Sequence, residues 1–151
     1  MTDPIIKTID VACPPAEAFA VFVERIAVWW PLDGHASSAA DGKAALGVTI
    51  EPEVGGRMYE TRHDGTFDEW GKVLAYAPGE RLTTTWHPGN NKHAPTQLDV
   101  TFEALEDGRC RVTLTHSGWE AWGDKADEMR GNYDTGWDFV FGDRYATAVP
   151  A

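Results

Sequence analysis

Two consecutive strands near the C-terminus constrain the fold more than any other feature of the sequence. Residues 96–104 and 109–117 alternate apolar and polar side chains, and a Glu-Asp-Gly turn at residues 106–108 joins them. An antiparallel pair with this alternation has one buried face and one face in water. Another element must therefore cover the buried face. The apolar positions that share this face include Leu98, Val100, Phe102, Cys110, Val112 and Leu114.

The other strands are predicted at hairpin spacing along the chain. Each is rich in residues that favour strands and is bounded by turn residues. Together with the first pair they form a curved antiparallel sheet of about seven strands. Their ranges are residues 5–11, 46–52, 57–62, 68–76 and 81–87.

Two short helices are predicted directly after the first strand. Residues 16–30 carry apolar side chains at helical spacing, with a break expected near Glu24 and an end at Pro31. The next segment, residues 32–43, is small and polar. A loop of this length is suited to form a lid or a rim.

The only long helix expected in the sequence covers residues 132–149, and it must pack on the apolar face of the sheet. Gly136 and Gly142 weaken it by about 1 kcal/mol each relative to Ala, which is acceptable if they allow close approach to the sheet. A twisted sheet wrapped around one helix leaves a gap where the curvatures do not match. We therefore predict a single α+β domain over residues 1–151 with a cavity between sheet and helix.

Charge and composition exclude several classes of function. The net charge is −11, and the 13 Lys and Arg residues are scattered, so neither nucleic acid nor an anionic membrane surface is an expected partner. No apolar stretch is long enough to span a membrane, and no signal peptide is visible. Cys13 and Cys110 form no C-x-x-C motif. We expect a cytoplasmic protein with free thiols, as a monomer or a homodimer.

Short motifs in a fixed order resemble one known superfamily. Individually they are common, but their order and spacing are specific to the fold. In sequence they are Pro15-Ala16-Glu17-Ala18-Phe19, Trp29-Trp30-Pro31, Glu51-Pro52-x-Val54-Gly55-Gly56-Arg57, Trp70-Gly71-Lys72-Val73, Pro78-Gly79-Glu80-Arg81-Leu82, Thr85-Trp86, His116-Ser117-Gly118-Trp119 and Gly136-Trp137.

From residue 5 to about residue 146 the chain resembles the START-like (SRPBCC) superfamily, and within it the branch named after the activator of heat-shock protein 90 ATPase. The resemblance implies the helix-grip, or Bet v-like, fold with an apolar cavity. It does not fix an activity, because the superfamily includes lipid carriers, polyketide cyclases, hormone receptors, pollen allergens and chaperone activators.

Aromatic side chains are the main candidates for the cavity wall, since the chain has seven Trp residues. Such a wall suits a hydrophobic or aromatic small molecule, and the alternative is that these residues fill a core. Whether Trp70 points inward stays open, because Lys72 has the same strand parity. The candidates are Trp30, Met58, Trp70, Trp86, Phe102, Trp137 and Phe141.

Two polar residues are candidates for the same cavity. By strand parity His116 lies on the buried face, where it is either a general acid or base or a hydrogen-bonded core histidine. Glu60 shares parity with Met58 and is either a buried carboxylate with a raised pKa or, if the opposite parity faces inward, a solvated residue.

No motif indicates a metal, a cofactor or a nucleophile. The other histidines show no ligand spacing, and no G-x-S-x-G is present. They are His35, His63, His87 and His93.

Three functions remain open. The first is non-catalytic binding of a small hydrophobic or aromatic molecule, oriented by Glu60 or His116. The second is a cochaperone-like or stress-response module that binds a chaperone or another protein. The third is a polyketide-cyclase-like enzyme in which His116 acts with a carboxylate.

Overall fold

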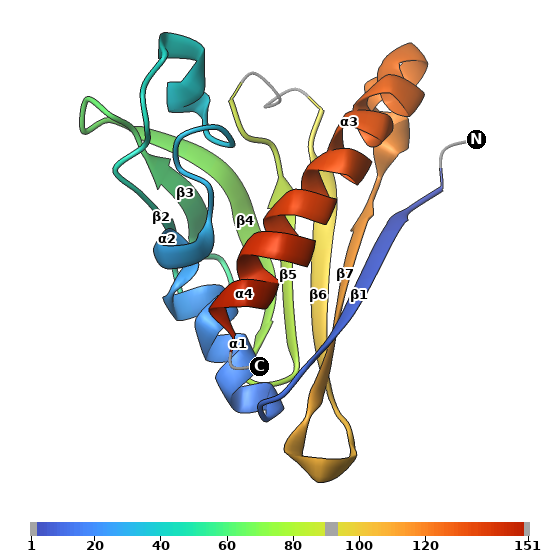
Figure 1. Cartoon of the computed structure of the whole chain (residues 1–151). Coiled ribbons are helices and arrows are strands. Elements are labelled where there is room, and N and C mark those ends of the chain that lie inside the picture. The colour runs from blue at the N-terminus through green and yellow to red at the C-terminus, as the bar shows by residue number, and fades with distance from the viewer. Residues whose placement is uncertain (1–2, 90–93, 150–151) are drawn as a thin grey trace.

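A computed structural model describes residues 3–89 and 94–149 and contains one antiparallel sheet, with the strand order β1-β7-β6-β5-β4-β3-β2. Strands β2 to β7 follow one another as neighbours, and β1 joins the sheet beside β7 (Figure 1). The seven-stranded prediction is confirmed. The strands are β1 (Ile5–Val11), β2 (Gly47–Ile50), β3 (Arg57–Thr61), β4 (Phe67–Ala77), β5 (Arg81–Trp86), β6 (Thr96–Ala104) and β7 (Cys110–Ser117).

Helices α1 (Pro15–Glu24) and α2 (Ile26–Trp29) follow β1, as predicted. Pro15 occupies the first turn, where its missing N–H leaves no hydrogen bond unmade. The two helices are separated at Arg25, whose φ of −113° is not helical. The long loop that follows contains a short 3-10 helix, η1 (Ser37–Asp41). A further 3-10 turn, η3 (Glu106–Gly108), joins β6 to β7.

The C-terminal helix begins earlier than predicted. A 3-10 segment, η4 (Trp119–Lys125), leads into α3 (Ala126–Phe139), a π-helical turn η5 (Val140–Tyr145) and a last turn α4 (Ala146–Ala148). The predicted start at residue 132 was wrong because, of residues 126–131, only Ala126 is buried. Without an apolar stripe these first turns show no helical period.

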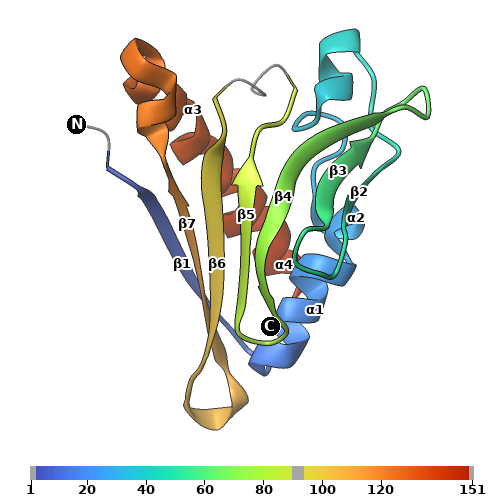
Figure 2. The same ribbon diagram turned by 180° about the vertical axis from the view of Figure 1, so that it is seen from behind.

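The helix lies diagonally across the concave face of the sheet (Figure 1), and the reverse view shows the sheet in front of it (Figure 2). None of the helices formed by the described residues could span a bilayer, since each is too short or too polar. The expectation that Gly136 and Gly142 permit close packing on the sheet was wrong. A Cβ atom placed on either glycine would have no neighbour within 4 Å.

A bulge in β4 decides the orientation that the sequence left open. The pairing passes from Met58 opposite Gly71 to Tyr59 opposite Glu69, so Trp70 has no partner in β3. The extra residue turns Trp70 inward, where it is 1% exposed, although Lys72 stays exposed. Gly71 is required here, because a Cβ atom would lie 1.9 Å from the Thr85 carbonyl oxygen.

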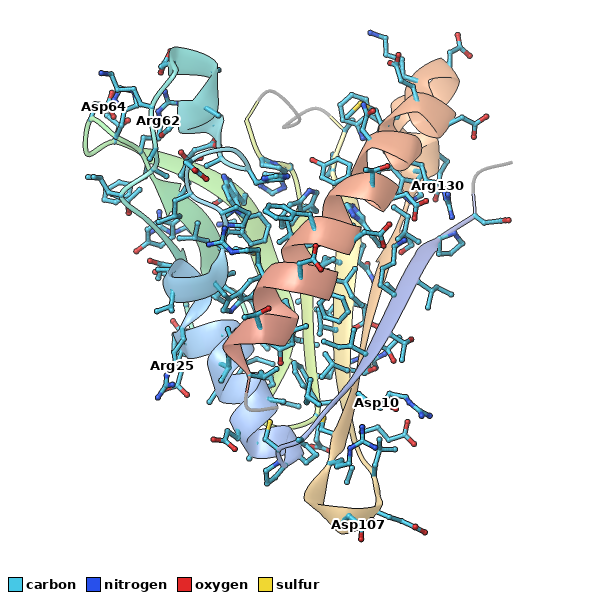
Figure 3. All side chains as sticks on the ribbon, viewed as in Figure 1. Asp10, Arg25, Arg62, Asp64, Asp107 and Arg130 are labelled. Carbon is cyan, nitrogen blue, oxygen red and sulfur yellow. The ribbon has the colours of Figure 1, made fainter. Side chains whose placement is uncertain are left out.

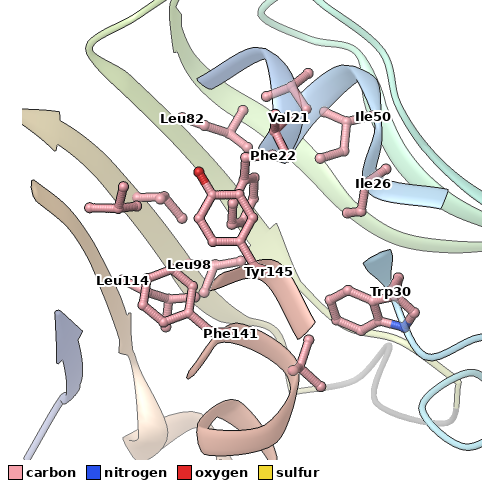
Figure 4. Close-up of a cluster of buried hydrophobic side chains, with 14 of the residues drawn as sticks. Val21, Phe22, Ile26, Trp30, Ile50, Leu82, Leu98, Leu114, Phe141 and Tyr145 are labelled. Atoms are coloured by element: carbon pink, nitrogen blue, oxygen red, sulfur yellow. The ribbon is translucent and has the colours of Figure 1, made fainter. Parts of the chain in front are cut away.

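One end of the space between helix and sheet is packed solid. Phe22 of α1 lies 5.1 Å from Trp29 and 5.2 Å from Tyr145, measured between ring centroids. The Tyr145 hydroxyl donates to the Ala18 carbonyl at 2.7 Å. Figure 4 shows Tyr145 and Phe141 reaching from the end of the helix into this cluster. We call this region, between α1, η5 and the part of the sheet that is lower in Figure 1, the closed end.

Candidate functional site

The opposite end of the same space contains a cavity of about 290 Å³. Residues from four parts of the chain line it: the loop after α2, β4, the end of β5 with the two residues after His87, and α3 with the first residue of η5. We call this region the open end. Its lining residues are Trp30, Gly34, His35, Ala36, Ser37, Trp70, Trp86, Pro88, Gly89, Tyr133, Gly136, Trp137 and Val140.

Four Trp rings form a continuous part of the cavity wall. The ring centroid of Trp30 lies 5.1 Å from that of Trp70 and 5.9 Å from that of Trp137. Trp86 lies 5.7 Å from Trp70 and 5.5 Å from Trp137. The rings meet at tilted or edge-to-face angles, as aromatic pairs prefer. Figure 3 shows side chains in the space between the sheet and the C-terminal helix.

The indole N–H groups of these four rings differ in one respect. Trp30 donates to the His35 carbonyl at 2.7 Å, and Trp137 donates to Nδ1 of His116 at 3.0 Å. The indole nitrogens of Trp70 and Trp86 are buried and have no hydrogen-bond acceptor among the described residues. A buried donor without a partner costs roughly 1–3 kcal/mol.

His116 is fully buried and both of its ring nitrogens are occupied. An indole N–H can only donate, so Nδ1 accepts from Trp137 and the proton of the neutral ring is on Nε2. Nε2 then donates to Oγ1 of Thr96 at 2.6 Å. Burial lowers the pKa of His116 to about 3, so the ring is neutral near pH 7. This arrangement favours the interpretation as a hydrogen-bonded core histidine, which holds Trp137 in the cavity wall.

Glu60 is also fully buried, which settles the parity of β3, but its environment differs from the expected one. Its carboxylate accepts hydrogen bonds from the backbone N–H of Ser37 at 2.7 Å, the backbone N–H of Ser38 at 3.0 Å and the Ser38 hydroxyl at 2.7 Å. Burial raises the pKa of Glu60, but these hydrogen bonds outweigh it and the net pKa is lowered. The expected raised pKa was wrong, because the donors come from a loop more than 20 residues away in sequence.

The loop that carries Ser37 is the rim of the cavity, and Glu60 of β3 and Arg62, which follows β3, hold it in place. Besides the bonds to Glu60, Nη1 of Arg62 donates to the Ser37 hydroxyl at 2.8 Å, and Nη2 of Arg62 pairs with Asp41. Glu60 therefore acts on the cavity indirectly, through the position of the rim. Glu60 on β3 and His116 on β7 have three strands between them in the sheet.

The structure brings only part of the predicted cavity set together. Trp30, Trp70, Trp86 and Trp137 line the cavity. The other five are buried in the core outside the cavity wall: Met58, Glu60, Phe102, His116 and Phe141.

Some of the predicted residues lie outside the cavity because the space between helix and sheet is longer than the cavity. Phe102 lies 5.2 Å from Phe19, and Phe141 stacks on Tyr145 at 5.6 Å, so both belong to the closed end. Strand parity identifies the inward face of an element but not the position along it.

Sequence reasoning missed the helix residues Tyr133, Gly136 and Val140 and the rim residues 34–37. The helix residues had a usable signal, because with Trp137 they follow the spacing of one helix face. The rim residues had no such signal in the sequence, because their position depends on hydrogen bonds to Glu60 and Arg62. Among the described residues no three His, Cys, Asp or Glu side chains form a group that could hold a metal ion, and His93 lies outside them.

A curved antiparallel sheet that grips a long C-terminal helix, with a cavity between the two, defines a helix-grip domain. This fold supports the assignment of the chain as a ligand-binding domain. The sequence model of the family described as "Activator of Hsp90 ATPase homolog 1-like protein" matches residues 12–144, and the chain belongs to this family. No curated protein matches the chain.

Several solved structures are similar over almost the whole chain. An anthrahydroquino-gamma-pyrone synthase, Txn09 complexed with SUM, is 30% identical, with a TM-score of 0.63 and coverage of 97% of this chain and 96% of that one. The self-sacrificing resistance protein CalC from Micromonospora echinospora is 21% identical, with a TM-score of 0.66 and coverage of 97% and 93%. Protein MLL2253 from Mesorhizobium loti is 16% identical, with a TM-score of 0.69 and coverage of 97% and 96%. The last two show the fold alone.

Proposed function

We propose that the chain binds a small, flat aromatic molecule in the cavity of the open end without changing it chemically. The observation that carries the proposal is the cavity of about 290 Å³ with four Trp rings in its wall. Ligand pockets are mostly apolar and hold few polar groups, and this volume is at the small end of their range. Rings in the wall offer stacking and edge contacts to a flat ligand.

The lining also has a neutral character that suits an apolar ligand. The lining residues that the structure describes include no Lys, Arg, Asp or Glu. His35 is the one imidazole among the described lining residues, and burial lowers its pKa, although Asp33 opposes that shift. A charged ligand would therefore lose hydration without gaining a charged partner among these described residues.

Gly136 keeps part of the cavity open. It lies on α3 in the lining, and a Cβ atom there would meet nothing within 4 Å. The first side-chain atom at this position would therefore meet free space, and we expect a larger side chain here to displace a ligand. Gly142, six residues along the same helix, also has nothing within 4 Å but is outside the lining, which makes it the matched control.

The test is isothermal titration of the protein with two-ring aromatic probes such as naphthol and tetralin. We expect binding to the native chain and to Gly142→Leu, and at least a tenfold loss in Gly136→Leu, because the side chain fills the cavity. Circular dichroism and the melting temperature establish that both variants are folded. Equal binding by both variants, or no binding by the native chain, would overturn the proposal.

A catalytic alternative has one specific observation in its favour, the 30% identity to a structure named as a synthase. Catalysis would change the bound molecule chemically, whereas simple binding would leave it unchanged. Mass spectrometry of a probe recovered after long incubation should return the compound unchanged if the chain only binds it. A changed mass that depends on the folded protein would favour catalysis.

A further inference from the structure

We infer that the imidazole of His35 is the gate of the cavity: it closes the opening against Phe139 of α3 and rotates away when a ligand enters or leaves. The inference rests on the proposed function and deepens it, because it states where the ligand passes and which side chain controls the rate of passage.

The opening of the cavity lies beside Gly34 and His35. Of the lining residues that the structure describes, these two are the exposed ones, whereas the others are buried or half-buried. Gly34 has no side chain, and a Cβ atom there would meet nothing within 4 Å. His35 therefore supplies the side chain at this opening.

The His35 ring reaches from the rim to the C-terminal helix. Its centroid lies 5.4 Å from that of Phe139, with 38° between the ring planes. Phe139 is 40% exposed and is not part of the lining, although Trp137 and Val140 of the same helical stretch are. A ring that lines the cavity and also packs on a residue outside the lining lies across the gap between rim and helix. The contact therefore closes the opening on this side.

The backbone of the rim is fastened on both sides of the His35 side chain. The His35 N–H donates to the Pro31 carbonyl at 3.0 Å, and the His35 carbonyl accepts from the Trp30 indole at 2.7 Å. The Ser37 N–H is bound to the Glu60 carboxylate at 2.7 Å. Moving the loop to open the cavity would break these hydrogen bonds.

The His35 side chain, by contrast, is held by one ring contact. Its imidazole nitrogens make no hydrogen bond or ion pair with the described residues, and Phe139 is the ring beside it. One aromatic pair is weaker than several hydrogen bonds together, and exposed side chains change rotamer within picoseconds to nanoseconds. Rotation of the imidazole is therefore the least costly way to open the cavity.

The test is a stopped-flow measurement of naphthol binding at pH 8, followed through the fluorescence of the Trp rings in the wall. Burial lowers the pKa of His35, so its ring is neutral at this pH. In Phe139→Ala we expect the rates of association and dissociation to rise by the same factor, about three- to tenfold, because no ring contact holds the gate closed. The dissociation constant should stay within about twofold, since Phe139 does not line the cavity and both rates rise together.

A second variant and a control locate the effect. His35→Ala removes the gate itself, so association should accelerate at least as much as in Phe139→Ala. The double variant should associate no faster than His35→Ala, because both substitutions break the same contact. Thr135→Ala is the matched control, since Thr135 is exposed on the same helix and outside the lining, and its rates should equal those of the native chain. Circular dichroism establishes that each variant is folded.

The results that contradict the gate are separable from failure of the proposed function. Native association rates in both Phe139→Ala and His35→Ala overturn the gate and leave the proposed function standing, as does an equal rise in Thr135→Ala. Faster dissociation in His35→Ala alone also overturns the gate and makes His35 a residue that contacts the ligand. Failure of naphthol to bind the native chain overturns the proposed function together with the gate.

Discussion

The closed end and the open end lie under the same helix and against the same sheet, and both are built from aromatic side chains, yet only one is filled. At the closed end Phe22 contacts Trp29 and Tyr145, and the Tyr145 hydroxyl and the Trp29 indole both have backbone acceptors. At the open end a cavity remains and two indole donors have no acceptor among the described residues.

The difference shows how one scaffold divides stability from binding. Filling space and pairing every polar group maximises the free energy of unfolding. A void and unpaired donors lower the free energy of unfolding. The same features let a ligand gain binding free energy when it fills the void. The two ends should therefore respond oppositely to substitution, with stability changing at one and ligand affinity at the other.

The largest effect is expected for Phe22→Ala at the closed end. Phe22 is 1% exposed, and removing a buried ring from a filled region costs about 3–5 kcal/mol. Urea unfolding measures the loss, and probe affinity at the open end should stay within about twofold when the variant is folded. A loss below about 1.5 kcal/mol would show that the closed end is not packed as described.

The second prediction concerns His116, whose ring packs against Trp86, Tyr133 and Trp137 behind the wall of the open end. Its folded pKa of about 3 lies below the ordinary value of 6.5, so protons bind preferentially to the unfolded chain. Its contribution to stability is therefore present above pH 6.5 and is lost as the pH falls. From pH 6.5 to 5 the free energy of unfolding should drop by about 1.6 kcal/mol, because the slope rises from half of its maximum at pH 6.5 towards the limit of about 1.4 kcal/mol per pH unit.

His116→Gln provides the control, because it removes this titration and leaves His35 in place. Urea unfolding at several pH values between 5 and 7 should give a clearly smaller slope for the variant. Identical slopes in the two proteins would mean that His116 titrates normally and is accessible to protons, which would reopen its use as a general acid or base.

The sequence predicts the sheet well because alternation is a local property. Each strand shows its buried face through its own residues, and β6 and β7 have the predicted one-sided burial. The order of the hairpins then follows from short turns, since consecutive strands joined by short turns usually pair.

The open end was harder to predict because its decisive contacts are not local. The bulge that turns Trp70 inward depends on the close approach of Gly71 to Thr85, and the pKa of Glu60 depends on donors from Ser37 and Ser38. Neither pairing leaves a periodic signal in the sequence. The family resemblance implied a cavity, but the position of that cavity along the helix required the packing of both ends.

The third prediction concerns the rim of the open end. Glu60→Gln replaces an acceptor oxygen by a donor that faces the Ser37 and Ser38 donors. We expect a loss of about 1.5 kcal/mol, because hydrogen bonds to a charged acceptor are stronger than neutral ones. Faster hydrogen exchange at the N–H groups of Ser37 and Ser38, together with weaker probe binding, should accompany it.

Glu53→Gln is the control for this substitution, since Glu53 is exposed at a turn and surface changes of this kind are usually within about 0.5 kcal/mol. Unchanged hydrogen exchange at Ser37 and Ser38 in Glu60→Gln would show that the carboxylate does not hold the rim.

The smallest effect separates stability from binding within one helix. Gly136→Ala and Gly142→Ala each add a Cβ atom that meets nothing within 4 Å, and each should stabilise the helix by up to about 1 kcal/mol. Only Gly136 lines the cavity, so only Gly136→Ala should also weaken aromatic probes, because the methyl group occupies part of the ligand's space. Thermal melts and titrations of the two variants side by side measure both effects. If Gly136→Ala stabilises the chain and binds probes as tightly as Gly142→Ala, the void beside α3 is larger than any ligand needs, and the glycine does not restrict which molecules enter.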